Sequence, residues 1–186
     1  MVIVEIDTRQ IGKATRALGH IKNGVPRALV PAINRSLSSG RTTLKREIRK
    51  NYLIKAKDIP ITMRGANYGH LGGDLRIKQG MLELGKFKVK PRGMQRRKVK
   101  KPLTVQVKVS GGGKLLRHAF MTDALNYAGP YQRKGKSRLP IKALLTIGAP
   151  IMASQPTVGP AVNKSMGDTL DKRIDHEIKR VLAITP

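Results

Sequence analysis

The chain has 186 residues, of which 38 are Lys or Arg and 11 are Asp or Glu, giving a formal net charge of +27. Charge of this size opposes a compact state unless a polyanion or an acidic surface compensates it, so we expect a strongly negative partner. The absence of Cys excludes disulfides, thiolate metal sites and a Cys nucleophile. Four Tyr, two Phe and no Trp are too few for a sheet that binds single strands by base stacking.

The N-terminal part of the chain predicts a short strand followed by two helices. Residues 2–6 alternate as a strand does, and an apolar face of helical spacing runs from Asp7 or Thr8 to about residue 21. A longer helix is expected over about 26–52, because apolar residues recur every four positions. Pro26 suits the first turn of that helix, whereas Pro31 either kinks it or moves its start.

The middle of the chain, from about 59 to 144, changes from helical to alternating periodicity. Turns are predicted at 78–80 and 110–113, and Val89 is expected to lie in a strand paired with the strand of Val105. The segment Ser110-Gly-Gly-Gly-Lys114 lacks the GxxxxGK[ST] spacing of a phosphate loop, so a glycine turn explains it better. Strands are predicted at 75–78, 81–90, 103–109, 115–121 and 139–147.

The C-terminal part predicts one long helix over about 155–183, with an apolar stripe at intervals of four and three. Four of the eleven acids lie on it, and beside His176 they have the residue types of metal ligands. Neighbouring Lys and Arg at i,i+4 spacing favour intrahelical ion pairs instead, such as Asp175 with Lys179. Because no nucleophile–base pair or paired carboxylates can be argued, we expect no enzyme activity, no metal and no cofactor.

These elements predict an α+β fold, in which an antiparallel sheet, barrel- or sandwich-like, is accompanied by a long N-terminal helix and a long C-terminal helix. No repeat or linker divides the sequence, so a single domain over 1–186 is expected, with a basic insertion at 86–101. No apolar run approaches the roughly 18 residues that a membrane span needs, so no membrane contact is expected.

The densest charge lies over 86–101, which we call the basic arm; it holds nine basic residues in sixteen and no acid. Such a block is either a solvated loop or a surface that contacts phosphates or an acidic protein. The second interpretation is favoured because 85–142 holds seventeen Lys and Arg against one acid. Sequence-specific reading of DNA is not expected. The candidate contact residues are Lys86, Lys88, Lys90, Arg92, Arg96, Arg97, Lys98, Lys100 and Lys101.

Three segments occur in a characteristic order: VPRALVPAINR at 25–35, the basic arm, and RLPI at 138–141, all before a long charged helix. In this order they resemble the minor tail protein Z family of tailed bacteriophages, over about residues 20–183. The N-terminal VIVEIDTR is similar to small head–tail joining proteins related to that family.

The resemblance implies a structural virion protein, without catalytic residues, at the upper end of the tail where it meets the head. It implies a ring, with a hexamer favoured, around the path of double-stranded DNA. Implied partners are the tail terminator and the head-closure ring, and implied locations are the virion and, during assembly, the host cytoplasm. Composition alone supports an alternative, a non-specific nucleic-acid-binding protein of ribosomal or nucleoid type.

Overall fold

The computed structural model describes residues 2–4, 8–78, 80–93, 102–123 and 128–184. Two compact units are formed by interleaved parts of the chain. Unit 1 comprises residues 1–47, 61–78 and 153–186, and unit 2 comprises residues 48–60 and 79–152. A single domain over 1–186 stays a prediction.

Unit 1 contains helices α1 (Thr8–Leu18), α2 (Gly24–Asn51, whose last residues belong to unit 2) and α4 (Val158–Ile184). The predicted stripe on α2 is confirmed, since Leu29, Ile33, Leu37 and Leu44 are at most 1% exposed. Pro26 lies in the first turn, where no intrahelical donor is lost. The helix begins before Pro31 and continues through it, so Pro31 does not set the start.

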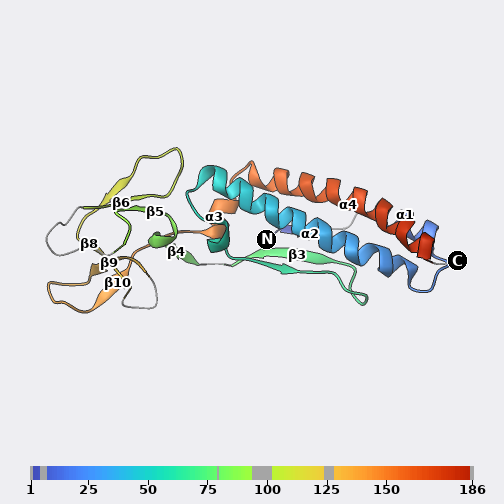
Figure 1. The fold of residues 1–186 in the computed structure, drawn as a ribbon, viewed down its shortest axis with the longest axis horizontal. Helices are drawn as coiled ribbons and strands as arrows, with labels where there is room; N and C mark the ends of the chain where they lie inside the picture. The colour runs from blue at the N-terminus through green and yellow to red at the C-terminus, as the bar shows by residue number, and fades with distance from the viewer. Residues whose placement is uncertain (1, 5–7, 79, 94–101, 124–127, 185–186) are drawn as a thin grey trace. The chain divides into compact units, whose positions relative to one another are not determined.

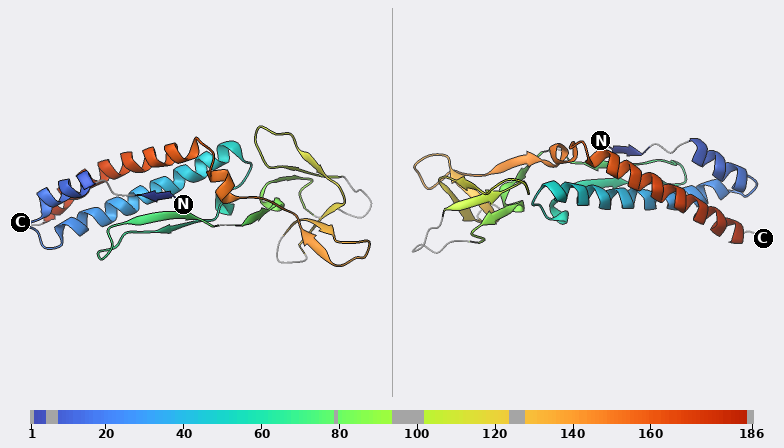
Figure 2. Two further views of the ribbon diagram at one scale, coloured as in Figure 1. Left: turned by 180° about the vertical axis from the view of Figure 1, so that it is seen from behind. Right: turned by 90° about the horizontal axis from the view of Figure 1, so that it is seen from above.

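Helices α2 and α4 run antiparallel and side by side, as both views of the unit show (Figures 1 and 2). The stripe predicted for α4 is buried, Met166 and Ile174 among its members. The side chain of Met166 packs directly onto Gly40, where an added Cβ would lie 2.2 Å from Met166 Sδ. Ser36, 1% exposed, donates a hydrogen bond of 2.7 Å to the Met166 carbonyl. The absence of a side chain at Gly40 therefore makes room for the Met166 side chain between α2 and α4.

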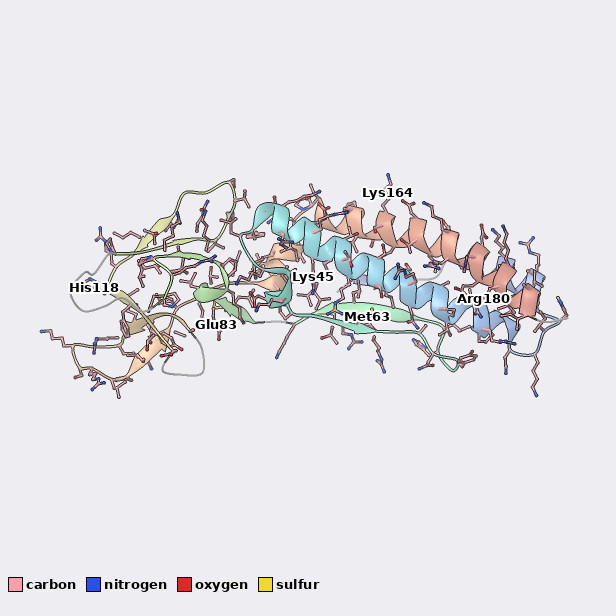
Figure 3. All side chains as sticks on the ribbon, viewed as in Figure 1. Lys45, Met63, Glu83, His118, Lys164 and Arg180 are labelled. Carbon is pink, nitrogen blue, oxygen red and sulfur yellow. The ribbon has the colours of Figure 1, made fainter. Side chains whose placement is uncertain are left out.

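A three-stranded antiparallel sheet, in the order β1-β3-β2, completes unit 1. Strand β3 pairs with β1 through Val2↔Leu75 and with β2 through Met63↔Leu75. Leu75 is fully buried, and Met63 Sδ lies 4.0 Å from Ser38 Oγ of α2 (Figure 3). The strands are β1 (Val2–Val4), β2 (Ile61–Arg64) and β3 (Gly73–Ile77).

The side chain of Asn34 ties the β2–β3 connection to α2. Its Nδ2 donates to the Ala66 carbonyl at 3.2 Å, and its Oδ1 accepts from the Ala66 amide at 2.8 Å. An added Cβ at Gly65 would lie 2.5 Å from Asn34 Oδ1, so the loop can approach only because residue 65 is glycine. Asn34 belongs to the VPAINR segment, which therefore carries a specific tertiary contact.

Unit 2 consists of small antiparallel sheets in the orders β5-β6-β7, β8-β9-β10 and β11-β4. The expected pairing of Val89 with Val105 is confirmed. The elements are η1 (Ala56–Asp58), β4 (Met81–Glu83), η2 (Leu84–Lys86), β5 (Lys88–Lys90), β6 (Leu103–Gln106), β7 (Lys114–Leu116), β8 (Ala119–Thr122), β9 (Gly129–Arg133), β10 (Ile141–Ala143), β11 (Leu145–Gly148) and α3 (Ala149–Ala153).

Three strands predicted in unit 2 are interrupted. The strand expected over 81–90 is broken by η2, where the Phe87 amide bonds to the Leu84 carbonyl at 3.1 Å. The strand expected over 115–121 turns at His118, whose φ is 58°. The strand expected over 139–147 is two strands, β10 and β11, which pair with different partners. In all three segments the alternating apolar pattern predicted extended backbone correctly, but it did not indicate where the strands are interrupted.

The α+β class, the antiparallel sheets and the two long helices are confirmed, and the described strands do not close into a barrel. Among the described residues, no helix combines the length and the apolar composition that crossing a membrane requires.

Candidate functional site

The described part of the basic arm begins at Lys86, at the end of η2, and continues along strand β5, which pairs with β6. Val89 and Val105 face each other in this register and are 5% and 6% exposed. Because side chains alternate along a strand, Lys88 and Lys90 lie on the opposite, solvent-exposed face. The buried valines thus orient two of the predicted contact residues outward.

Four of the nine predicted contact residues lie in the described part of the arm. Lys88, Lys90 and Arg92 are exposed, whereas Lys86 is half-buried and its Nζ lies 3.1 Å from Glu83 Oε2. Glu83, labelled in Figure 3, therefore compensates one charge of the arm. The other five residues lie outside the described residues: Arg96, Arg97, Lys98, Lys100 and Lys101.

A cavity of about 280 Å³, here called the basic pocket, lies within unit 2. It brings three predicted contact residues together with two cations that the sequence analysis did not include in the site. Among the described residues, no acidic side chain lines it. Its cations are Arg49, Lys55, Lys86, Lys88 and Arg92.

Backbone hydrogen bonds bring the end of α2 to the basic arm. The Leu53 amide donates to the Val107 carbonyl, and the Val109 amide donates to the Asn51 carbonyl, both at 2.9 Å. These bonds place Arg49, in the last turn of α2, near strand β5. Arg49 continues a row of basic residues along α2 that is visible in the sequence, but only the tertiary structure joins it to residues 86–92.

Two of the chain's six aromatic residues line the same pocket. Tyr52 is 3% exposed and Phe87 is 6% exposed, so the pocket combines an apolar wall with cationic groups. Guanidinium and ammonium groups in such a place bind carboxylate or phosphate oxygens through charge-assisted hydrogen bonds. The site can hold an anion, and we find no arrangement in it for bond cleavage.

A second group of cations lies on the β9–β10 hairpin, whose connecting residues 134–140 are all exposed. The Lys134 amide donates to the Pro140 carbonyl at 3.0 Å, which closes the hairpin at the RLPI segment. The guanidinium of Arg133 lies 5.4 Å from the centre of the Phe120 ring, a cation–π contact. The cations of this hairpin are Arg133, Lys134, Lys136, Arg138 and Lys142.

Tyr131 supports the hairpin from the interior of unit 2. It is 1% exposed and pairs with Phe120 across β8 and β9. Burial, and then the nearby Glu83 carboxylate, raise the pKa of Tyr131 above its usual value of 10.0. Its phenol therefore remains neutral at physiological pH, which suits a core position beneath a strongly basic surface.

The acids of α4 have structural partners. Asp175 pairs with Lys13 of α1, not with Lys179 as the sequence suggested, and Glu177 pairs with Arg180 at 2.5 Å. Arg180, labelled in Figure 3, also donates to the Arg27 carbonyl at 3.2 Å. Among the described residues, no group of three or more His, Asp or Glu side chains is placed to hold a metal ion.

Comparison with known families gives one match, to the prophage minor tail protein Z (GPZ) family, over residues 9–185. The chain belongs to this family. The match covers nearly all of both units, so it applies to the helical unit and to the basic one alike. Searches among curated proteins and among solved structures each gave no significant match.

Membership confirms the resemblance drawn from the order of the segments and makes this chain a structural protein of a phage tail. A tail protein is part of the virion, and its natural partners include other tail proteins. The basic pocket and the cationic hairpin are therefore surfaces of a virion component.

Proposed function

We propose that this minor tail protein completes the upper end of a phage tail and joins it to the head around the DNA channel. In this proposal the basic surface of unit 2 faces DNA or an acidic neighbouring ring. We define that surface as the basic arm, the basic pocket and the cations of the β9–β10 hairpin. Its role is to hold and position, without catalysis or a cofactor.

The observation that carries the proposal is the concentration of charge in unit 2. That unit holds 21 Lys and Arg against three acids, whereas unit 1 holds 17 against eight. Duplex DNA carries one negative charge per roughly 1.7 Å of its axis, and a surface with this excess of cations is complementary to it in sign. Contacts to backbone phosphates need no sequence specificity, as a channel through which a whole genome passes requires.

Oligomerisation strengthens this argument. Six copies of a +27 chain would place a formal charge of about +160 in one ring, and that charge requires compensation by DNA or by acidic neighbours. We propose a homo-oligomeric ring, with a hexamer favoured, that contacts the tail terminator and the head-closure ring. The chain would be present in the host cytoplasm during assembly and in the virion thereafter.

Deletion of the gene from the parent phage tests the role. We expect a lysate in which negative-stain images show full heads and tails that are separate, or joined particles that fail to deliver DNA. Complementation in trans should restore infectivity. Normal infectious virions without this protein would contradict the proposal and would favour the alternative of a non-specific nucleic-acid-binding protein.

A charge-neutralised variant tests the basic arm separately. Replacing Arg92, Arg96, Arg97 and Lys98 by Gln should lower infectivity while the protein still folds. The matched control replaces four exposed cations of unit 1 by Gln, with the same change in net charge: Lys22, Arg41, Lys164 and Lys179. Equal infectivity of the two variants would remove the arm from the mechanism.

A further inference from the structure

A second cationic site lies wholly within unit 1, on the outer side of the α2–α4 pair. It is a groove of about 530 Å³ that is lined by six Ser and Thr side chains and four cations. We call it the hydroxyl groove. The residues that line it include neither an acid nor an apolar side chain, although two packed helices normally meet through apolar residues. The cations are Arg35, Arg46, Lys172 and Arg173.

Four hydroxyl groups form a connected network on the floor of the groove. Ser165 Oγ lies 3.0 Å from Ser39 Oγ and 2.9 Å from Thr43 Oγ1, and Thr169 Oγ1 lies 3.0 Å from Ser39 Oγ. Thr43 is only 5% exposed. A hydroxyl has one proton and two lone pairs, so a member of the network can accept from its neighbour and turn its own proton toward a bound anion.

The walls of the groove are held in place by the close helix contact described above. Gly40 and the bond from Ser36 to the Met166 carbonyl fix α2 against α4 beside the hydroxyl network. Ser38 Oγ donates to the Asn34 carbonyl, and Thr42 Oγ1 donates to the Ser38 carbonyl, both at 3.0 Å. The protons of these two hydroxyls are therefore engaged within α2. Thr169 Oγ1 likewise donates to the Ser165 carbonyl at 2.7 Å. The donors available to a ligand are therefore the hydroxyls of Ser39, Thr43 and Ser165 and the four cations.

The charges around the groove are unequal. Arg46 Nε lies 3.4 Å from Glu47 Oε1, so the Glu47 carboxylate partly compensates the charge of Arg46. Arg35, Lys172 and Arg173 line the groove from the two helices. Asp168 is exposed on α4, one turn before Lys172, and does not line the groove. The lining thus has the composition of a phosphate site, since Arg, Lys, Ser and Thr are the side chains that contact nucleic-acid phosphates.

We propose that the hydroxyl groove binds the phosphate groups of a nucleic-acid backbone, as a second contact site in addition to the basic surface of unit 2. The inference rests on the cavity, its hydroxyl network and its cations, and it does not depend on the role proposed for the basic arm. A protein with both sites would hold nucleic acid through two units of different architecture.

Titration of the full-length protein with inorganic phosphate, followed by amide chemical shifts, tests the site. We expect shifts at Ser39, Thr43, Ser165 and Thr169 that saturate, and that chloride of equal ionic strength does not reproduce. The double variant Arg35→Gln/Arg173→Gln should weaken this response on the order of tenfold, because two charge-assisted hydrogen bonds are lost. Asp168→Asn should strengthen the response to phosphate, because it removes a negative charge near the groove.

The matched control is Arg41→Gln/Lys164→Gln, which has the same net charge and retains the lining of the groove. Lys164 points into solvent away from α2 (Figure 3). We expect this control and the variant of the basic arm to keep the response at the four amides. The proposal would be overturned by an equal loss in the control, by shifts that follow ionic strength alone, or by a stronger response to acetate than to phosphate.

A short DNA duplex should then compete with phosphate at these amides, and failure to compete would exclude a nucleic-acid backbone as the ligand.

Discussion

The two units of this protein use charge in different ways. In unit 1 several acids form ion pairs, such as Asp175 with Lys13 and Glu177 with Arg180, and the apolar stripes of α2 and α4 are buried. In unit 2 there are seven basic residues for each acid, and the sheets have two or three short strands. Unit 1 is organised around close packing, and unit 2 presents cations on small sheets. The excess positive charge of the chain therefore lies mainly in unit 2.

The largest effect is expected from a cavity in unit 1. Leu37 is fully buried, and an added Cβ on Gly73 would lie 2.5 Å from its Cδ1, so Leu37 fills the space between α2 and β3. Leu37→Ala should lower the free energy of unfolding by about 2–5 kcal/mol, measured by urea titration. The exposed Leu182 provides the control, and Leu182→Ala should change stability by less than about 0.5 kcal/mol. Similar losses in both variants would refute the view that unit 1 depends on this packing.

A smaller effect, with opposite signs at two positions, is expected from glycines in the helices. Gly40→Ala should destabilise the protein by about 1–3 kcal/mol, because the new methyl group overlaps Met166. Gly167→Ala on α4 meets no atom within 4 Å and should stabilise the protein by about 0.5–1 kcal/mol through helix propensity. Melting temperatures measure both changes. Stabilisation by Gly40→Ala would show that the packing of Met166 does not require a glycine at position 40.

The contact between Asn34 and Ala66 is expected to contribute less. Asn34→Ala removes two hydrogen bonds and should cost about 1–2 kcal/mol, with faster amide exchange in residues 65–72. The control is Asn163→Ala, at an exposed position of α4, which should leave that exchange unchanged. If the exchange in 65–72 is the same in both variants, Asn34 does not fix the β2–β3 connection.

The smallest effect, and the one that compares the units directly, is the response to salt. Raising the salt concentration from about 0.01 M to about 1 M shortens the Debye length from about 30 Å to about 3 Å and screens like-charge repulsion. We expect amide exchange on β6 to slow several-fold, whereas exchange at the centre of α2 should change by less than about twofold. Equal changes in both units would mean that the excess charge of unit 2 does not weaken its folded state.

The sequence by itself determined the long helices, most of the strand regions, the overall charge and the family, but it missed β2, β9 and α3. Helical periodicity predicted α2 and α4 to within a few residues, because an amphipathic stripe of seven or eight turns leaves few alternatives. The pairing of β5 with β6 was also predictable, since alternating valines stand on both sides of one polar insertion. Even the family could be inferred from three short segments in order.

Only the tertiary structure decided which distant residues meet. Arg49 joins Lys86 and Lys88 because backbone bonds between 51–53 and 107–109 bring those segments together, and no local pattern encodes such pairing. The hydroxyl groove was missed for the same reason. Ser and Thr on α2 and α4 looked like ordinary polar positions, and they form one network only because the fold places the two helices side by side. Periodicity indicates which face of an element is buried, whereas the partner of that face depends on contacts between residues far apart in the sequence.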